Sequence, residues 1–280
     1  MNQPDSPYDF IRIPQEIRSA EDRLIPDSKR YFDFLMGQNT QIPEEVDLMF
    51  AFFHPSHSLS FQKIFLEETD LKLNKIKELD AWTTTLANGS TVGACSLPIG
   101  SSGASTRLEI LRHLNFRNLV ILGFSGAPGE DHPVGEWKLI DQAICHEGSS
   151  LLYREEGVFS YPHFGLTESL EQLLVEQEIA FRKGLAWTVD NPFRIQSTAY
   201  KFWKKKQTIS IDMECSAIFS LCNHHKIPAA CLHVTSDQLS PDNWNLGFHS
   251  SSLKESWNQL LRWCARLPDS LPGLQTSSSY

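Results

Sequence analysis

The sequence lacks the features of several large classes of protein. No apolar run approaches the roughly 20 residues that a membrane-spanning helix needs, and the longest, such as Leu119 to Leu122, have the length of a strand. The N-terminus has no basic region followed by an apolar stretch, so it does not predict a secretory signal. The six cysteines form no CxxC pair and mostly stand in apolar surroundings. This is typical of reduced, buried thiols in a cytoplasmic protein and not of a disulfide framework.

An excess of positive charge is also missing. The chain has 25 basic and 34 acidic side chains and a net charge of −9, whereas nucleic-acid-binding domains usually carry a basic face. The one dense basic cluster, KFWKKK at Lys201 to Lys206, could contact phosphate, but it more simply predicts a solvated helix face. We therefore expect a small polar ligand, with no nucleic acid polymer and no membrane as partner.

A metal site is not indicated by sequence spacing. Histidines and cysteines gather in one region, but their spacing fits no common zinc pattern, and adjacent histidines point to different faces of a helix. The residues in question are Cys222, His224, His225 and His233. We expect neither a metal nor an organic cofactor.

The length and composition suit one globular domain. The 280 residues are 41% hydrophobic and 21% charged, which is ordinary for a folded protein. Residues 1–45 are polar and form an N-terminal extension, with a helix predicted at Ser28 to Met36. Residues 46–267 form the domain, and the tail, 268–280, is expected to be disordered.

Beyond residue 45, strand-like apolar runs alternate with helical patterns and glycine-rich turns. Strands are predicted at 46–53, 119–123, 137–143, 208–212 and 229–234, and a hairpin joins 81–87 to 91–97 through Asn88-Gly89. Helices are predicted at 60–76, 104–114, 167–183, 214–223 and 253–267. This order predicts an α/β fold in which helices flank a central sheet.

Four polar segments stand at the ends of predicted strands. They are Gly100 to Gly103 (GSSG), Gly123 to Gly126 (GFSG), Met213-Glu214 and Ser236-Asp237. Ligands of open α/β sheets bind beyond the carboxyl ends of the strands, so these segments predict a shared site. Glu214 and Asp237 are its acidic members, although each could instead be a helix-capping or turn residue.

The segment from Ile211 to Leu239, IDMECSAIFSLCNHHKIPAACLHVTSDQL, resembles the C-terminal signature of the nucleoside phosphorylase family. In that signature a strand leads to Met-Glu, and a helix and an apolar strand then lead to Ser-Asp. Segments 98–126, 134–153 and 184–194 are similar to earlier loops of the family, so the resemblance covers about residues 46–267. It implies a three-layer sandwich with a central mixed sheet, an enzyme acting on the N-glycosidic bond of a nucleoside, and a homo-oligomer.

The resemblance also implies roles for the two acids. Glu214 would accept hydrogen bonds from the ribose 2′- and 3′-hydroxyls, while Met213 packs on the sugar. Asp237, beside Ser236, would protonate the purine N7, because cleavage leaves negative charge on the departing base. An Asp at this position favours a purine over a pyrimidine.

The base is expected to contact the segment Asp190 to Arg194. The resemblance implies that Phe193 stacks on the base, although the alignment could shift this role to Pro192. Asp190 lies in the same segment. Arg194 could contact the base or an anionic substituent, or could form an ordinary salt bridge.

The phosphate-binding residues of the family are altered here. An arginine of its first loop aligns with His57, an arginine of its second strand aligns with Ile121, and a hydroxyl residue aligns with Phe124. The glycines at 100 and 123 remain, and Ser125 offers a hydroxyl. The Glu with which the hydrolytic branch activates water is also absent. Three alternatives stay open: phosphorolysis with phosphate as co-substrate, hydrolysis, and a non-catalytic nucleoside sensor.

Overall fold

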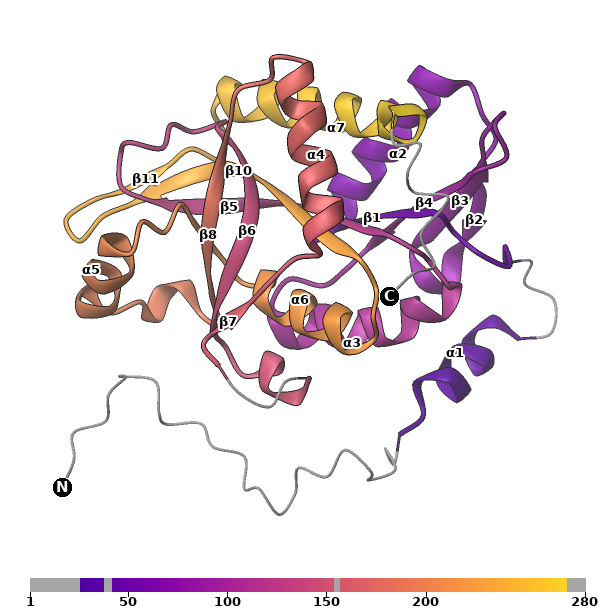
Figure 1. The fold of residues 1–280 in the computed structure, drawn as a ribbon, viewed down its shortest axis with the longest axis horizontal. Coiled ribbons are helices and arrows are strands. Elements are labelled where there is room, and N and C mark those ends of the chain that lie inside the picture. The colour runs from indigo at the N-terminus through magenta and orange to yellow at the C-terminus, as the bar shows by residue number, and fades with distance from the viewer. Residues whose placement is uncertain (1–25, 38–41, 154–156, 271–280) are drawn as a thin grey trace.

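The structure is a computed structural model, and it describes residues 26–37, 42–153 and 157–270. Its strands form one mixed sheet in the order β11-β10-β6-β8-β9-β5-β1-β4-β3-β2, with β7 paired to β6. Because β10 also pairs with β5, five strands close on themselves, and β1 to β4 extend outside this ring (Figure 1). The bounds are β1 (Leu48–Phe52), β2 (Asn74–Ile76), β3 (Ala81–Thr85), β4 (Thr91–Ser96), β5 (Leu119–Pro128), β6 (Trp137–His146), β7 (Phe159–Ser160), β8 (Phe181–Val189), β9 (Ser210–Asp212), β10 (Ala229–Leu239) and β11 (Trp244–Leu246).

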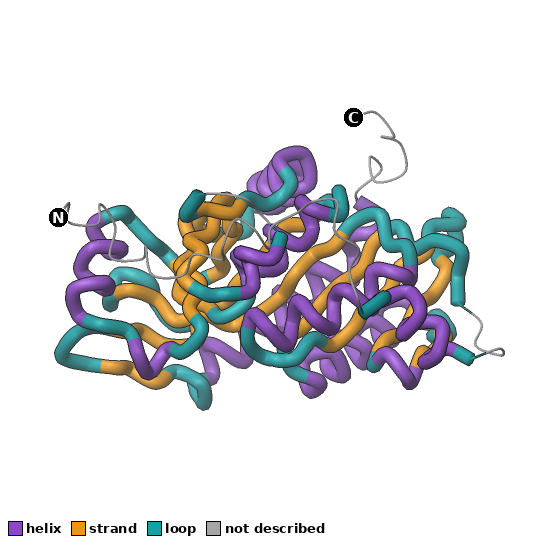
Figure 2. Tube along the Cα trace, turned by 90° about the horizontal axis from the view of Figure 1, so that it is seen from below, coloured by secondary structure: helices purple, strands orange, loops and turns teal. Residues whose placement is uncertain are grey.

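Helices cover both faces of the sheet. Helices α2, α4 and α7 lie on one side and α1, α3 and α6 on the other (Figure 1), and in the turned view of Figure 2 the strands run between and behind helices. Each side has its own buried apolar core. The predicted central mixed sheet flanked by helices is confirmed. The bounds are α1 (Ser28–Met36), α2 (Pro55–Thr69), α3 (Ser101–Leu111), α4 (Phe164–Glu176), α5 (Ser197–Lys205), α6 (Cys215–His224) and α7 (Ser251–Ser270), with short 3-10 turns η2 (Lys77–Leu79), η3 (Arg112–Leu114), η4 (Ser149–Leu152) and η5 (Pro192–Arg194).

Two predicted helices have the wrong bounds. Helix α2 begins at Pro55 instead of residue 60, because the His54 ring accepts a hydrogen bond from the backbone N–H of Ser56 and proline suits the first helical position. It ends at Thr69, because the next residue, Asp70, has a φ of 52°, and residues 74–76 of the predicted helix form strand β2 instead. His57 therefore lies in the first turn of a helix. Helix α4 likewise ends at Glu176, and residues 181–183 begin strand β8.

Two strands run well past their predicted ends. β5 and β10 pair in parallel as far as Pro128 and Leu239, with an irregularity in β10 between Thr235 and Asp237. The prediction that Gly123 to Gly126 and Ser236-Asp237 stand at strand ends is therefore wrong, since both lie inside strands. The polar residues did not end the strands because the backbone pairing between β5 and β10 continues through them.

Two local predictions are confirmed and one is corrected. The helix predicted at Ser28–Met36 is α1, and its Phe32 is only 2% exposed in the core shared with α3. The hairpin turns at Asn88-Gly89, where Gly89 has a φ of 89°. Of the tail that was expected to be disordered, residues 268–270 belong to α7, and the remainder lies outside the described residues.

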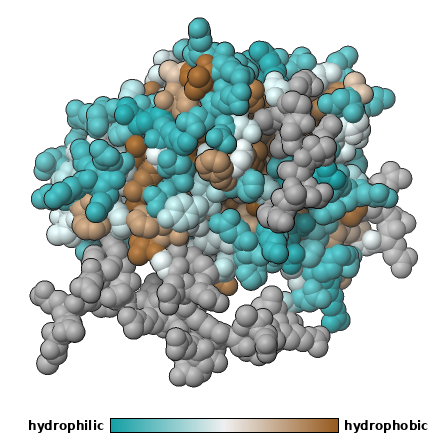
Figure 3. All heavy atoms as spheres, viewed as in Figure 1, coloured by the Kyte–Doolittle hydropathy of each residue, from teal (hydrophilic) through white to brown (hydrophobic). Residues whose placement is uncertain are grey.

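The molecular surface is mainly hydrophilic. Figure 3 shows a largely hydrophilic face on which apolar side chains gather in a few patches. The lysines of KFWKKK are exposed on and just after α5 while Trp203 is buried, as expected of a solvated helix face. Within the described ranges, no helix combines the length and the apolar character that crossing a bilayer would require.

Candidate active site

One cavity of about 680 Å³ gathers most of the predicted site residues. Its walls come from strands β5 and β10, the start of α2, the turn η5, the β9–α6 junction and strand β11. Gly100, Asp190 and Arg194 do not line it: Gly100 reaches it only through its backbone, and the other two side chains are exposed. The predicted residues that line the cavity are His57, Gly123, Phe124, Ser125, Phe193, Met213, Glu214, Ser236 and Asp237.

Glu214 stands at the start of α6 but does not cap it. Asp212 takes that role, because its Oδ1 accepts the backbone N–H groups of Glu214 and Cys215, both at 2.8 Å. The Glu214 carboxylate, only 5% exposed, instead accepts the N–H of Gly100 at 2.6 Å and that of Met213 at 3.3 Å. Burial, and then the charge of Asp212, raise the pKa of Glu214 to about 8 despite these two donors.

Asp237 lies in β10 immediately after its irregularity and is 8% exposed. Its Oδ1 accepts the hydroxyl of Ser236 at 2.6 Å, and its Oδ2 accepts the indole N–H of Trp244 at 2.6 Å. Gly126 is its partner in β5, and a Cβ there would stand 3.3 Å from Oδ2. The glycine at position 126 therefore leaves space for the Asp237 carboxylate.

Trp244 is a member of the site that sequence reasoning missed. It belongs to β11, which folds back on β10 so that Leu239 faces Trp244 and Asp237 faces Leu246. The available signal was the turn-forming stretch 240–243 (SPDN), which indicates a turn but not which residue the following strand presents. Trp244 also approaches Phe193, at 5.8 Å between ring centroids, and both side chains are substantially exposed beside the cavity.

The end of the cavity near α2 is aromatic and uncharged. The His57 ring lies 4.6 Å from Phe124 and 4.9 Å from Trp257, between ring centroids. Burial, and then the neighbouring His54, lower the pKa of His57 to about 4, so the ring is neutral at pH 7. Ser125 has a buried hydroxyl for which the described residues supply no hydrogen-bond partner.

No lysine or arginine of the described ranges lines the cavity. Ile121, which aligns with a phosphate-binding arginine, is buried in the core on the α3–α6 side of the sheet. Phosphate recognition usually relies on arginine or lysine together with hydroxyl and backbone donors. Here the cavity retains only the neutral donors.

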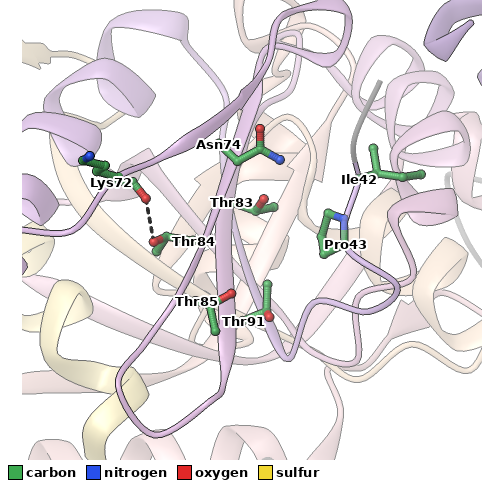
Figure 4. A pocket seen from close by; sticks show the side chains of 8 residues that line it. All are labelled: Ile42, Pro43, Lys72, Asn74, Thr83, Thr84, Thr85 and Thr91. Atoms are coloured by element: carbon green, nitrogen blue, oxygen red, sulfur yellow. Dashed lines mark hydrogen bonds between the residues drawn. The ribbon is translucent and has the colours of Figure 1, made fainter. Parts of the chain in front are cut away.

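A second hollow, of about 370 Å³, lies beside strands β2, β3 and β4. Figure 4 shows mainly threonine side chains around it, together with Lys72, Asn74, Ile42 and Pro43, and a hydrogen bond from Thr84 to the backbone oxygen of Lys72, at 2.9 Å. It presents no carboxylate, imidazole or thiol. Acid–base chemistry is therefore better supported in the larger cavity.

Comparisons with known proteins agree with this fold. Residues 61–263 match the profile of the Phosphorylase superfamily, and the chain belongs to that family. A DeoD-type purine nucleoside phosphorylase of Clostridium perfringens is 25% identical over 183 residues, covering 62% of this chain and 77% of the relative. One from Brevibacillus brevis is 25% identical over 132 residues, covering 47% and 56%.

A solved structure extends the comparison to the fold. The uridine phosphorylase of Vibrio fischeri superposes with a TM-score of 0.65 at 19% identity, covering 79% of this chain and 91% of that one. The predicted nucleoside phosphorylase resemblance is thus confirmed at the level of family and fold, and an enzyme of this type is supported. These similar proteins include both purine and pyrimidine enzymes, so they do not determine which base the substrate of this chain carries.

Proposed function

We propose that this chain cleaves the N-glycosidic bond of a purine nucleoside or deoxynucleoside. The observation that carries the proposal is that Glu214 and Asp237, from separate elements, line one cavity. Its volume of about 680 Å³ falls in the range usual for small-molecule sites. The reaction needs neither a metal nor an organic cofactor.

Glu214 binds the sugar in this proposal. A buried carboxylate accepts charge-assisted hydrogen bonds from two neighbouring hydroxyls, which is the pattern of the ribose 2′- and 3′-hydroxyls. Its two backbone donors, from Gly100 and Met213, hold the carboxylate in position. Met213 lines the same cavity and can pack on the sugar ring.

Asp237 protonates the departing base in this proposal. Cleavage leaves negative charge on the purine, and a proton delivered to N7 neutralises it, an effect typically worth about 10²–10⁴-fold in rate. The aromatic side chains beside Asp237, Phe193 and Trp244, offer faces on which a purine can stack. The purine assignment is also supported by the DeoD-type relatives.

The test is an assay of free base. The purified chain is incubated with adenosine, inosine, guanosine, methylthioadenosine and uridine. We expect release from at least one purine nucleoside and none from uridine. Asp237→Asn should lower kcat by about 10²–10⁴-fold with little change in nucleoside binding, whereas Glu214→Gln should weaken both. If Asp237→Asn has the activity of the parent, Asp237 is not the general acid. If the parent binds nucleosides without releasing base, the chain is a nucleoside sensor and not an enzyme.

A second candidate concerns the acceptor, for which we propose water in place of phosphate. The supporting observation is that the lining of the cavity offers no cation within the described ranges, and that His57 is neutral at pH 7. A phosphate dianion there would lose its hydration without a charged partner, which is costly. Base release should therefore proceed at the same rate with and without added phosphate. A rate that rises in proportion to phosphate would identify a phosphorylase instead.

Assembly and location remain proposals. Exposed apolar side chains stand around the mouth of the cavity at Ile99, Phe193, Trp244 and Phe248, which supports a homo-oligomer that covers them. In the part of the chain that the structure describes, none of the six cysteines forms a disulfide, although Cys215 and Cys231 lie near each other. Reduced thiols of this kind are consistent with the reducing cytoplasm.

A further inference from the structure

Three side chains of metal-ligating type meet in the core beside Glu214. They are Cys215 at the start of α6, and Cys231 and His233 on β10. One potential ligand atom from each lies within 4.8 Å of the other two, and all three residues are buried. The Sγ of Cys231 is 3.1 Å from Nε2 of His233. The three residues come from two consecutive elements, α6 and β10, and Cys231 and His233 are separated by one residue.

The dimensions of this group suit zinc. With Zn–S bonds of about 2.3 Å and Zn–N bonds of about 2.0 Å, tetrahedral geometry places sulfur and nitrogen about 3.6 Å apart and two sulfurs about 3.8 Å apart. The Sγ of Cys231 and the Nε2 of His233 are 3.1 Å apart, which is about 0.5 Å less than this tetrahedral separation, so the two side chains would move slightly apart around an ion. Two sulfurs and an imidazole also form the ligand set that zinc prefers.

His233 is held in an orientation that leaves one nitrogen for a ligand. Its Nδ1 lies 2.9 Å from the hydroxyl of Ser210, a neighbour in β9. When the Nδ1 proton is directed to Ser210, Nε2 presents its lone pair toward the two thiols. Metal-binding histidines are almost always fixed in this way by a hydrogen bond at the other ring nitrogen.

Asp212 lies next to this group but outside it. Its Oδ1 accepts the backbone N–H of Cys215 at 2.8 Å, which holds the first residue of α6 in place.

We propose that Cys215, Cys231 and His233 form a zinc site. They supply three of the four ligands of tetrahedral zinc, and in this proposal a water molecule completes the set. The ion would tie the start of α6 to β10, and so fix the segment that carries Glu214. The proposal does not depend on the proposed function, because metal content is measured without a nucleoside.

The test is the zinc content of the untagged full chain. Protein produced in zinc-supplemented medium and dialysed against metal-free buffer should retain about one zinc per chain, as expected of a site with several thiolate and imidazole ligands. Cobalt added to the apo protein should give the sulfur-to-cobalt charge-transfer absorption of a thiolate site. A strong chelator should lower the Tm of the parent protein.

Matched variants locate the site. Cys231→Ser and Cys215→Ser should lose or weaken zinc retention, while Cys222→Ser should retain it, because Cys222 is equally buried on α6 but lies outside the group. Parent protein that binds neither zinc nor cobalt overturns the proposal even if the variants fail to fold. A disulfide between Cys215 and Cys231 in freshly prepared protein, detected by mass spectrometry, also overturns it.

Discussion

Asp237 accepts hydrogen bonds at both carboxylate oxygens, and the two donors have different consequences. The Ser236 hydroxyl can either donate or accept, whereas the indole N–H of Trp244 can only donate. Because the indole N–H can only donate, it fixes the direction in which Oδ2 faces, and Trp244 is therefore a positioning residue for Asp237.

Trp244→Phe should lower kcat and leave KM little changed. The phenyl ring keeps the aromatic wall but removes the N–H that contacts Oδ2, so the Asp237 carboxylate is held less firmly. A hydrogen bond contributes about 1 kcal/mol, so we expect kcat for base release to fall by about three- to tenfold. Asn245→Ala is the control, since Asn245 bonds to Gln238 in the same hairpin and does not touch Asp237. Equal kcat values for Trp244→Phe and the parent would contradict the role.

At this scale the sequence predicted nine of the 21 residues that line the cavity. Glu214 and Asp237 were recognisable because each comes after an apolar, strand-like run in a specific family pattern, and both line the same cavity. Trp244 was not predictable, because its contact depends on the path of a hairpin. Asp190 and Arg194 were expected near the base, but their side chains are exposed outside the lining because η5 directs Pro192 and Phe193 inward.

At the scale of elements, polar residues inside strands were the main source of error. Thr235, Ser236 and Asp237 look like the end of a strand, yet β10 continues through them because Thr235 and Asp237 pair with Ser125 and Gly126 of β5 on either side of the irregularity at Ser236. The side chains of Ser236 and Asp237 hydrogen bond to each other and line the cavity. Local polarity alone does not distinguish such a strand from one that has ended, since the difference depends on the neighbouring strand.

Helix α1 belongs to the folded domain more closely than its place in the polar N-terminal extension suggests. Phe32 is 2% exposed and meets the ring of His113, at 5.6 Å between centroids, while Phe34 on the same helix is 77% exposed. Phe32→Ala should therefore lower the free energy of unfolding by about 3–5 kcal/mol. Phe34→Ala, the matched control, should change it by no more than about 0.5 kcal/mol. Denaturant titration compares the two, and equal effects would mean that α1 does not contribute to the core.

At the scale of the whole molecule, the layers were predictable and the closure of the sheet was not. The alternation of apolar runs with amphipathic helices predicts a sheet covered on both faces. The pairing of β10 with β5 joins strands separated by about a hundred residues, and no local periodicity encodes it. That pairing aligns Gly126 with Asp237 and so creates the cavity. The overall fold was predictable only from the family resemblance, because members of a family share such long-range strand pairings.

The burial of Glu214 makes the stability of the whole molecule depend on pH. Because burial and Asp212 raise the pKa of Glu214 from 4.5 to about 8 in the folded state, the folded chain holds a proton that the unfolded chain releases between these values. Its contribution to stability is complete below about pH 4.5 and is lost as the pH rises through about 8. The Tm of the parent should therefore fall relative to that of Glu214→Gln, whose amide does not titrate, across a series from about pH 5 to pH 9. A nucleoside whose hydroxyls bond to the ionised carboxylate should offset part of this loss. Parallel Tm curves for the two proteins without ligand would mean that Glu214 is already ionised in the empty cavity. That outcome would contradict the prediction that burial keeps this carboxyl group protonated.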